Sequence, residues 1–296
     1  MSRELQIGKD GNGNPSVWTR NGRAPDWSSP VCLLLHGYNV EPQGAASNYE
    51  RLFRTIQEKA KTLLPPLLDS RSWLVYWQGY ASGGLAPGKT LSSPLTYASQ
   101  IPSAREAAEA LRRYIDQRSP TRFAPQITLI AHSLGCRVAL ELLDSYARFP
   151  AKGTPEFPLM VLMAAAVPAY FFEDLVRLWK GALLPETTLV LFSKRDWILA
   201  VPFRAGQTWA GEGVFPKAVG ATGRPGVGFW TRVVCTHNGH SDYFEDPQTA
   251  AEIADSLGQA PPKGLPVLCE RGAVMQPTNL LPALTLASRS VSGEQR

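Results

Sequence analysis

A serine at the end of an apolar run is the residue of this sequence with the clearest chemistry. Residues 127–131 (Ile-Thr-Leu-Ile-Ala) form the run, His-Ser-Leu-Gly (132–135) follows directly, and a helical pattern of apolar residues begins at once. A strand, a sharp turn carrying a serine and a helix are typical of a nucleophile elbow, which projects the hydroxyl beside free helix N–H groups. Gly135 and Ala131 supply the small residues that such a close passage of strand and helix needs. Ser133 is therefore the candidate nucleophile, and the alternative is a simple helix N-cap.

A serine hydroxyl is inert at neutral pH, so a neighbouring imidazole must take its proton. The chain has four histidines, which are His36, His132, His237 and His240. His132 adjoins the serine, and its side chain should point the other way. His36 ends the apolar run 31–35 and is better placed to hold the loop that follows. His237 and His240 therefore remain as candidate bases.

A carboxylate would be needed to orient that imidazole. Asp196 follows the apolar run 188–193 within three residues, and Trp197 and its neighbours can pack it in place. Asp174 is a weaker candidate, since it lies inside a helical pattern rather than at a strand end. Ser133, Asp196 and either histidine occur in the order serine, acid, histidine.

Three segments together resemble the serine hydrolases of the α/β-hydrolase fold, in particular a bacterial branch of that superfamily. They are His36-Gly-Tyr-Asn39, Ala131-His-Ser-Leu-Gly135 and Gly239-His-Ser-Asp-Tyr243, and the resemblance covers about residues 31–257. It implies a Ser133–His240–Asp196 triad, with His237 as the reserve base. It also implies an oxyanion hole made by the backbone N–H groups of Tyr38 and Leu134, and neither a cofactor nor a metal.

Apolar runs alternate with helical patterns along the chain, which predicts a mostly parallel sheet with helices on both faces. The N-terminal strands should be reduced, because residues 1–30 read as an irregular segment with room for no more than a short hairpin. Residues 31–257 should form the hydrolase domain, with a glycine-rich, irregular insertion at 203–228. This insertion forms a lid or substrate wall, and the alternative is plain disorder. A helix should begin at Ser103 with a capping box, and residues 258–296 should form a loosely ordered tail.

The formal net charge of +5 does not indicate nucleic-acid binding, because Lys and Arg are scattered along the chain. None of the four cysteines forms a C-x-x-C pair, which favours free thiols in a reducing compartment. The first ten residues lack a signal-peptide core and no apolar stretch is long enough to span a bilayer. We therefore expect a cytoplasmic protein without an integral membrane segment.

One motif points to a different chemistry. Residues 83–90 (Gly-Gly-Leu-Ala-Pro-Gly-Lys-Thr) match the phosphate-binding P-loop pattern in full. A P-loop follows a strand directly and opens a helix, but the preceding apolar run ends at Trp77 and a proline follows at position 94. The sequence favours a serine hydrolase acting on a small-molecule or lipid ester, with thioesters also open. A P-loop nucleotide-binding protein and a non-catalytic hydrolase-fold binding module are the alternatives.

Overall fold

The computed structural model of the protein describes residues 3–20, 22–38, 40–59, 65–77, 94–119, 124–150, 153–173 and 177–258. Within these residues eight strands form one sheet, in the order β2-β1-β4-β3-β5-β6-β7-β8. All neighbouring strands are parallel except the pair β1–β2. The strands are β1 (Glu4–Lys9), β2 (Pro15–Thr19), β3 (Val31–Leu35), β4 (Ser72–Tyr76), β5 (Ile127–His132), β6 (Leu159–Met163), β7 (Thr187–Ser193) and β8 (Arg232–Thr236).

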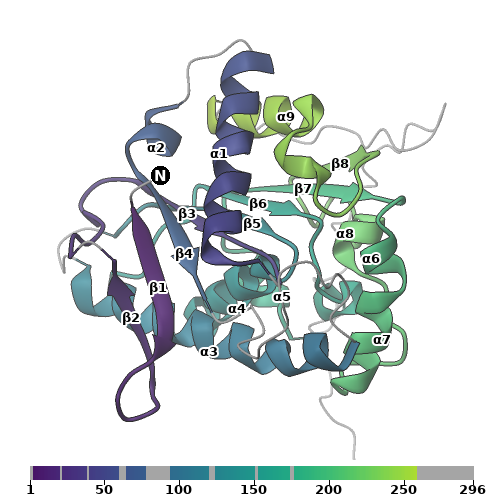
Figure 1. Ribbon diagram of the computed structural model, residues 1–296, viewed down its shortest axis with the longest axis horizontal. Coiled ribbons are helices and arrows are strands. Elements are labelled where there is room, and N and C mark those ends of the chain that lie inside the picture. The colour runs from purple at the N-terminus through teal and green to yellow at the C-terminus, as the bar shows by residue number, and fades with distance from the viewer. Residues whose placement is uncertain are drawn as a thin grey trace, which may run out of the picture.

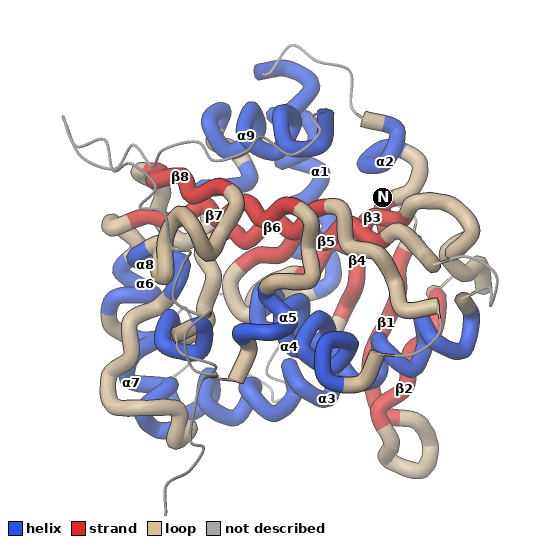
Figure 2. The backbone as a smooth tube through the Cα atoms, turned by 180° about the vertical axis from the view of Figure 1, so that it is seen from behind, coloured by secondary structure: helices blue, strands red, loops and turns tan. Residues whose placement is uncertain are grey.

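Helices cover both faces of this sheet, as the sequence predicted (Figure 1). One face carries α1 (Pro42–Lys59), α2 (Pro66–Asp69) and α9 (Pro247–Gly258), and the other carries α3 (Pro94–Arg118), α4 (Gly135–Arg148) and α5 (Trp179–Ala182) (Figure 2). Three further helices stack at the β7–β8 end of the sheet, α6 (Trp197–Ala200), α7 (Pro202–Trp209) and α8 (Val219–Thr222). Two 3₁₀ turns complete the elements, η1 (Ala169–Phe172) and η2 (Asp242–Phe244).

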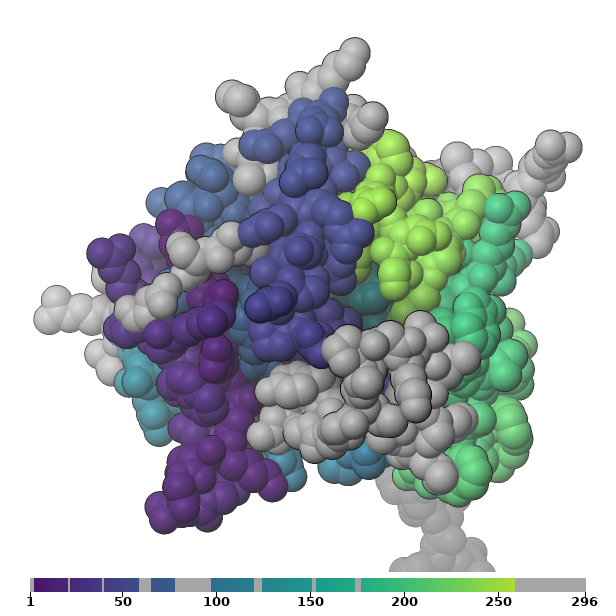
Figure 3. All heavy atoms as spheres, in the orientation of Figure 1, coloured from purple at the N-terminus to yellow at the C-terminus, as the bar shows by residue number. Residues whose placement is uncertain are grey.

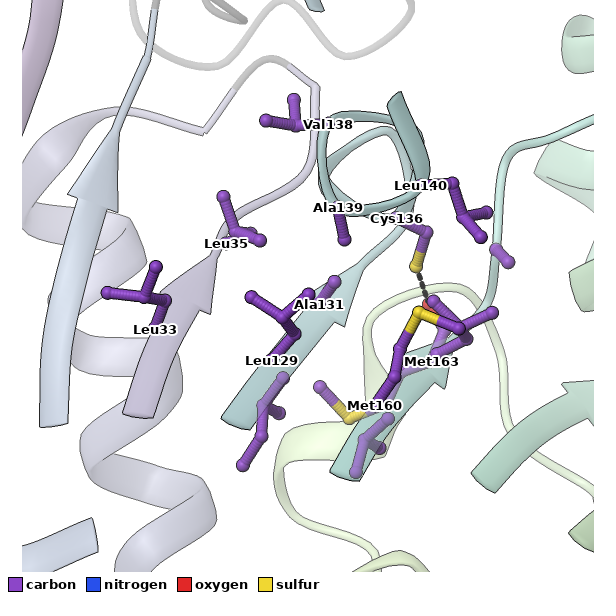
Figure 4. Packing of buried hydrophobic residues seen from close by; sticks show 14 of the residues in the cluster. Leu33, Leu35, Leu129, Ala131, Cys136, Val138, Ala139, Leu140, Met160 and Met163 are labelled. Carbon is purple, nitrogen blue, oxygen red and sulfur yellow. Dashed lines mark hydrogen bonds between the residues drawn. The ribbon is translucent and has the colours of Figure 1, made fainter. Parts of the chain in front are cut away.

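The central strands are buried along their whole length, because helices lie on both sides of them. Every residue of β3, β5, β6 and β7 is buried. A strand covered on both faces needs a continuous apolar run rather than an alternating one, and these four segments have such runs. Figure 4 shows side chains of β3, β5 and β6 side by side in this core, with α4 packed over them.

The direction of chain winding reverses between β3 and β5. Strand β3 pairs with β4 on one side and with β5 on the other. Ligands of open α/β sheets bind outside the carboxyl ends of the strands at such a reversal. Leu35 pairs with Ala131, so β3 and β5 end side by side. The loop after β3 and the turn at Ser133 therefore meet at the edge of the sheet where a site is expected.

Residues 4–19 form the short hairpin for which the sequence left room within the segment 1–30. Strands β1 and β2 are short, but they form an antiparallel hairpin with five residue pairs, from Leu5↔Thr19 to Lys9↔Pro15. The Asp10 carboxylate closes its turn by accepting the N–H groups of Asn12 and Asn14 at 2.9 Å each. Leu5 and Ile7 are the buried apolar residues of β1. Two inward-facing residues are too few for a recognisable alternation, which is why the sequence pattern did not predict β1 as a strand.

The prediction of an irregular insertion at 203–228 is also wrong in part, because α7 and α8 lie within it. Several of its glycines end these helices or permit close contact. Gly223 ends α8 with φ 68°, a left-handed conformation that glycine adopts without strain. At Gly220 a Cβ atom would lie 2.2 Å from the Ala165 nitrogen, so only glycine fits.

A buried ion cluster attaches the insertion to the rest of the domain. Arg137 of α4 is fully buried and binds Glu212 through two hydrogen bonds, of 2.9 and 3.0 Å. Its Nε donates to Glu141 at 2.7 Å, and Arg105 and Arg177 also pair with these glutamates. Burial alone would lower the pKa of the Arg137 guanidinium, but the two carboxylates outweigh it and the pKa is raised. The cluster therefore remains charged and fixes the position of Glu212 after α7.

The helix predicted from Ser103 begins nine residues earlier, at Pro94, and Pro102 lies inside it, so the expected capping box is wrong. The thiols of Cys32, Cys136 and Cys235 are free, as expected. The P-loop-like residues 83–90 and the tail at 259–296 lie outside the described residues. No helix in the described part of the chain is both long and apolar enough to cross a membrane.

Candidate active site

Ser133 lies in the turn between β5 and α4, as the sequence predicted. Its backbone has φ 53°, a left-handed conformation that is uncommon for a residue with a side chain. Hydrogen bonds to the end of β6 hold this conformation. The Ser133 N–H donates to the Met163 carbonyl at 2.9 Å, and the Ala166 N–H donates to the Ser133 carbonyl at 3.1 Å. A strained conformation fixed in this way is common at functional sites.

Two glycines let the β3 loop cross the turn at contact distance. A Cβ atom on Gly135 would lie 2.4 Å from the Leu35 carbonyl oxygen and 2.5 Å from that of His36. A Cβ atom on Gly37 would lie 2.8 Å from the Cβ of Ser133. Ala131, the last residue but one of β5, lies next to α4 (Figure 4). These approaches explain the small residues around the serine.

His240 links the serine to the aspartate. Its Nε2 lies 2.8 Å from Ser133 Oγ, and its Nδ1 lies 2.7 Å from Asp196 Oδ2. A carboxylate only accepts hydrogen bonds, so Nδ1 carries the proton and Nε2 is free to accept one from the serine hydroxyl. This is the tautomer that a general base requires.

Asp196 is held on both of its oxygens. It caps α6, and its Oδ1 accepts the Leu199 N–H at 3.1 Å while Oδ2 faces His240. Its exposed fraction is 1%. The cap therefore holds the carboxylate in place for the imidazole.

The other candidates take no part in this arrangement. His237 is exposed, and no contact among the described residues joins its side chain to Ser133 or Asp196. Asp174 lies outside the described residues. Of the candidate residues that the sequence singled out, the structure thus brings Ser133, Asp196 and His240 into contact.

His36 holds the loop after β3, as predicted. Its Nδ1 donates to the Gly37 carbonyl at 2.7 Å, and its Nε2 accepts the Trp77 N–H at 3.4 Å. The ring stacks on that of Trp77 at 5.7 Å. Burial lowers the pKa of His36 to about 4, so the ring is neutral at pH 7 and keeps both hydrogen bonds.

His132 supports the His240 loop, a role that the sequence did not reveal. Its Nε2 donates to the main-chain carbonyl of His240 at 2.7 Å. Its ring packs on His240 at 5.1 Å and on Phe244 at 4.9 Å. Burial and the neighbouring His240 lower the pKa of His132 to about 3. The only available signal was its position beside the serine, since the partner is 108 residues away in the sequence.

The proposed oxyanion donors flank the serine. Leu134 follows it, and Tyr38 follows Gly37, which lies against the Ser133 side chain. In the described part of the chain neither amide donates to a protein acceptor. These two backbone N–H groups are therefore the candidates for binding a negatively charged oxygen.

A chain of aromatic ring contacts begins at Tyr38. The Tyr38 and Tyr97 rings meet edge to face at 5.6 Å, and Phe203 of α7 lies 6.1 Å from Tyr97. The Tyr97 hydroxyl accepts a hydrogen bond from Gln207 at 3.1 Å. Helix α7 of the insertion therefore packs against Tyr97. Within the described ranges, no three His, Cys, Asp or Glu residues gather closely enough to ligate a metal ion.

Neither a protein-family model nor a curated protein sequence matches the chain. Among solved structures it is similar to a hyperthermophilic esterase from the archaeon Pyrobaculum calidifontis, at 14% identity over 86% of this chain and 82% of that one, with a TM-score of 0.41. It is also similar to an extracellular α/β-hydrolase from a Paenibacillus species, at 13% identity over 76% and 98% of the two chains, with a TM-score of 0.35. A thioesterase domain of the curacin biosynthetic pathway gives 11% identity over 86% and 99%, with a TM-score of 0.37. Likenesses this distant say nothing about the activity of this chain.

The fold follows from the geometry of the chain itself. The winding reverses between β3 and β5, and a left-handed serine stands at the end of β5. Serine, aspartate and histidine follow in that order, after β5, β7 and β8. With an eight-stranded, mostly parallel sheet covered on both faces, this chain has the α/β-hydrolase fold.

Proposed function

We propose that the protein is a cofactor-independent serine hydrolase that cleaves a carboxylic ester through an acyl-enzyme. The observation that carries the proposal is the position of His240, within 2.8 Å of Ser133 Oγ and 2.7 Å of Asp196 Oδ2. A nucleophile, a base and a group that orients the base are the parts that this chemistry requires.

In the first half of the reaction, Ser133 Oγ attacks the ester carbonyl carbon while His240 Nε2 takes the hydroxyl proton. The carbonyl oxygen becomes an oxyanion, which the N–H groups of Tyr38 and Leu134 stabilise. One such donor contributes on the order of 3 kcal/mol to the transition state. The C–O bond of the ester then breaks, His240 returns its proton to the leaving alcohol, and the acyl group stays on Ser133.

In the second half, water attacks the acyl-enzyme and His240 takes the water proton. The tetrahedral intermediate collapses, Ser133 regains its proton and the carboxylic acid leaves. A thioester would pass through the same steps with a thiol as the leaving group. The partly exposed ring of Tyr38, which packs on that of Tyr97, supports an apolar substituent on the substrate.

The test is covalent labelling of Ser133 by a fluorophosphonate probe, followed by peptide mapping. Ser133→Ala should abolish both labelling and the hydrolysis of p-nitrophenyl esters. Ser241→Ala, which removes an exposed hydroxyl beside His240, should retain labelling. Undiminished labelling of Ser133→Ala would place the nucleophile elsewhere. Esters of graded chain length would then define the acyl preference.

A further inference from the structure

Exposed apolar side chains are concentrated in one segment of this protein. Of nine large apolar side chains that are exposed in the described part of the chain, five lie between residues 197 and 215. These are Trp197, Val201, Trp209, Val214 and Phe215, with exposed fractions of 53, 65, 64, 86 and 54%. Single exposed apolar residues are normal, but a cluster of them marks an interaction surface. We refer to these five residues as the insertion face.

The five side chains lie on α6, at its junction with α7, on α7 and in the turn that follows α7. The Val201 N–H donates to the Trp197 carbonyl, and the Ala205 N–H donates to the Val201 carbonyl. Val201 lies at the junction of the two helices, four residues after Trp197, and Trp209 ends α7. Phe215 folds back beside α7, because its N–H donates to Thr208 Oγ1 at 2.7 Å. Figures 1 and 2 show α6 and α7 at the end of the molecule away from the β1–β2 hairpin.

The exposed charges of the segment that carries the insertion face have one sign. Residues 194–224 contain five cations, Lys194, Arg195, Arg204, Lys217 and Arg224. The two acids of the same segment are Asp196 and Glu212, with exposed fractions of 1 and 7%. Both are neutralised inside the protein, by His240 and by the Arg137 cluster. The surface of this segment therefore presents apolar and positively charged groups, and in Figure 3 it forms one edge of the molecule beside α9.

We propose that the insertion face docks on the surface of a membrane that contains anionic phospholipids. Tryptophan side chains favour the boundary between lipid and water, and flanking cations attract acidic head groups. A second copy of the chain fits poorly, because a two-fold interface would place these cations against one another. Asp196 precedes Trp197 directly, so docking would hold the proposed active site beside the lipid.

The test is co-sedimentation of the full chain with vesicles. One set contains phosphatidylcholine alone, and the other equal parts of phosphatidylcholine and phosphatidylglycerol. Binding should be at least ~10-fold tighter to the acidic vesicles and should weaken as salt is added. The double variant Lys217→Gln/Arg224→Gln should bind about 25-fold more weakly, since each cation near an acidic surface contributes about fivefold. Trp209→Ser and Val214→Ser should each weaken binding by about tenfold.

Matched controls come from the rest of the surface. Phe149 is 68% exposed, so Phe149→Ser removes an equally exposed aromatic residue, and Lys180→Gln removes an exposed cation. Both should bind like the unmodified chain. Ser133→Ala should also bind normally, which separates docking from the proposed hydrolysis. Equal affinity for both vesicle types, or a folded Val214→Ser and Trp209→Ser that bind no more weakly than Phe149→Ser, would overturn the proposal. A dimer that Trp209→Ser dissociates would overturn it as well.

Discussion

The imidazole of His132 donates a hydrogen bond of 2.7 Å to the main-chain carbonyl of His240. His132 immediately precedes Ser133, so one side chain connects the turn of the proposed nucleophile to the loop of the proposed base. The two parts of the site come from elements that are far apart in the sequence. A small displacement of either part would break the contact between His240 Nε2 and Ser133 Oγ, and rates depend steeply on such positioning.

Removing that donor should reduce turnover more than substrate binding. His132→Phe keeps a ring but cannot donate, so we expect kcat to fall by about 10- to 100-fold with little change in KM. His132→Gln carries an amide N–H at a similar distance from the backbone and should retain most of the activity. Kinetics on p-nitrophenyl acetate would decide, with circular dichroism as the check on folding. An equal loss in both variants would mean that ring packing, not the hydrogen bond, positions the loop.

Substitution of the two histidines in the loop after β8 should have sharply different effects on kcat. His240→Ala removes the group that contacts both Ser133 and Asp196, so kcat should fall by at least ~10³-fold. His237→Ala alters an exposed side chain and should leave kcat within about twofold. Steady-state kinetics of the two variants in parallel measure this difference. The opposite ranking would assign the base to His237.

The sequence predicted those parts of the molecule that depend on burial and chain order. Strands β3, β5 and β7 are continuous apolar runs because both faces are covered, and this pattern is visible without a structure. The residues that follow these strands necessarily lie at one edge of the sheet. Ser133, Asp196 and His240 could therefore be proposed from their positions, although the distances between them could not.

The sequence-based predictions that were wrong concern features that depend on tertiary contacts. Pro102 suggested the start of a helix, yet α3 continues through it, with Ile101 and Ala104 buried on either side. The glycines of the insertion suggested irregular backbone, but Gly220 is required by the proximity of Ala165, and Gly223 ends a helix. Tertiary packing decides whether a proline interrupts a helix or a glycine marks irregular backbone. The residues that pack there are distant in the sequence, so the local pattern does not reveal them.

The close passage of the β3 loop over the elbow should make Gly135 irreplaceable. Gly135→Ala would place a methyl group 2.4 Å from a backbone oxygen that cannot move freely, so we expect the protein to lose at least ~3 kcal/mol of stability or fail to fold. Gly11→Ala is the control, because a Cβ atom there has no neighbour within 4 Å. Urea denaturation would compare the two. A Gly135→Ala protein as stable as the control would show that the loop can move away.

Removing the buried Arg137 should destabilise the protein more than removing one partner of an exposed ion pair. Arg137→Met leaves Glu212 and Glu141 without their fully buried partner, and breaking such a pair costs about 3–5 kcal/mol. Arg51 and Glu245 form an exposed pair at 2.5 Å, so Arg51→Met should cost less than about 1 kcal/mol. Chemical denaturation measures both changes. Similar values would mean that Arg105 and Arg177 replace the lost charge.

Stability should fall on acidification through His36 and His132. Burial lowers the pKa of His36 to about 4 and that of His132 to about 3, while an unfolded histidine titrates near 6.5. As the pH falls below about 6.5, the unfolded chain binds protons that the folded chain does not, which favours unfolding. Each histidine should therefore remove about 1.4 kcal/mol of stability per pH unit between about pH 6 and pH 4. Well above pH 6.5, where the unfolded histidines are also neutral, their contribution is complete and constant.

The difference between variants isolates this effect from the titration of carboxylates. His132→Gln cannot be protonated, so its free energy of unfolding should fall less steeply than that of the unmodified chain, by about 1.4 kcal/mol per pH unit. His36→Gln should show the same difference down to about pH 4, where the folded protein itself begins to bind the proton. Urea unfolding at several values between about pH 7 and pH 4.5 gives the slopes. If all three proteins lose stability in parallel, the two rings are protonated within the folded state, and their hydrogen bonds to Gly37 and His240 do not require the neutral form.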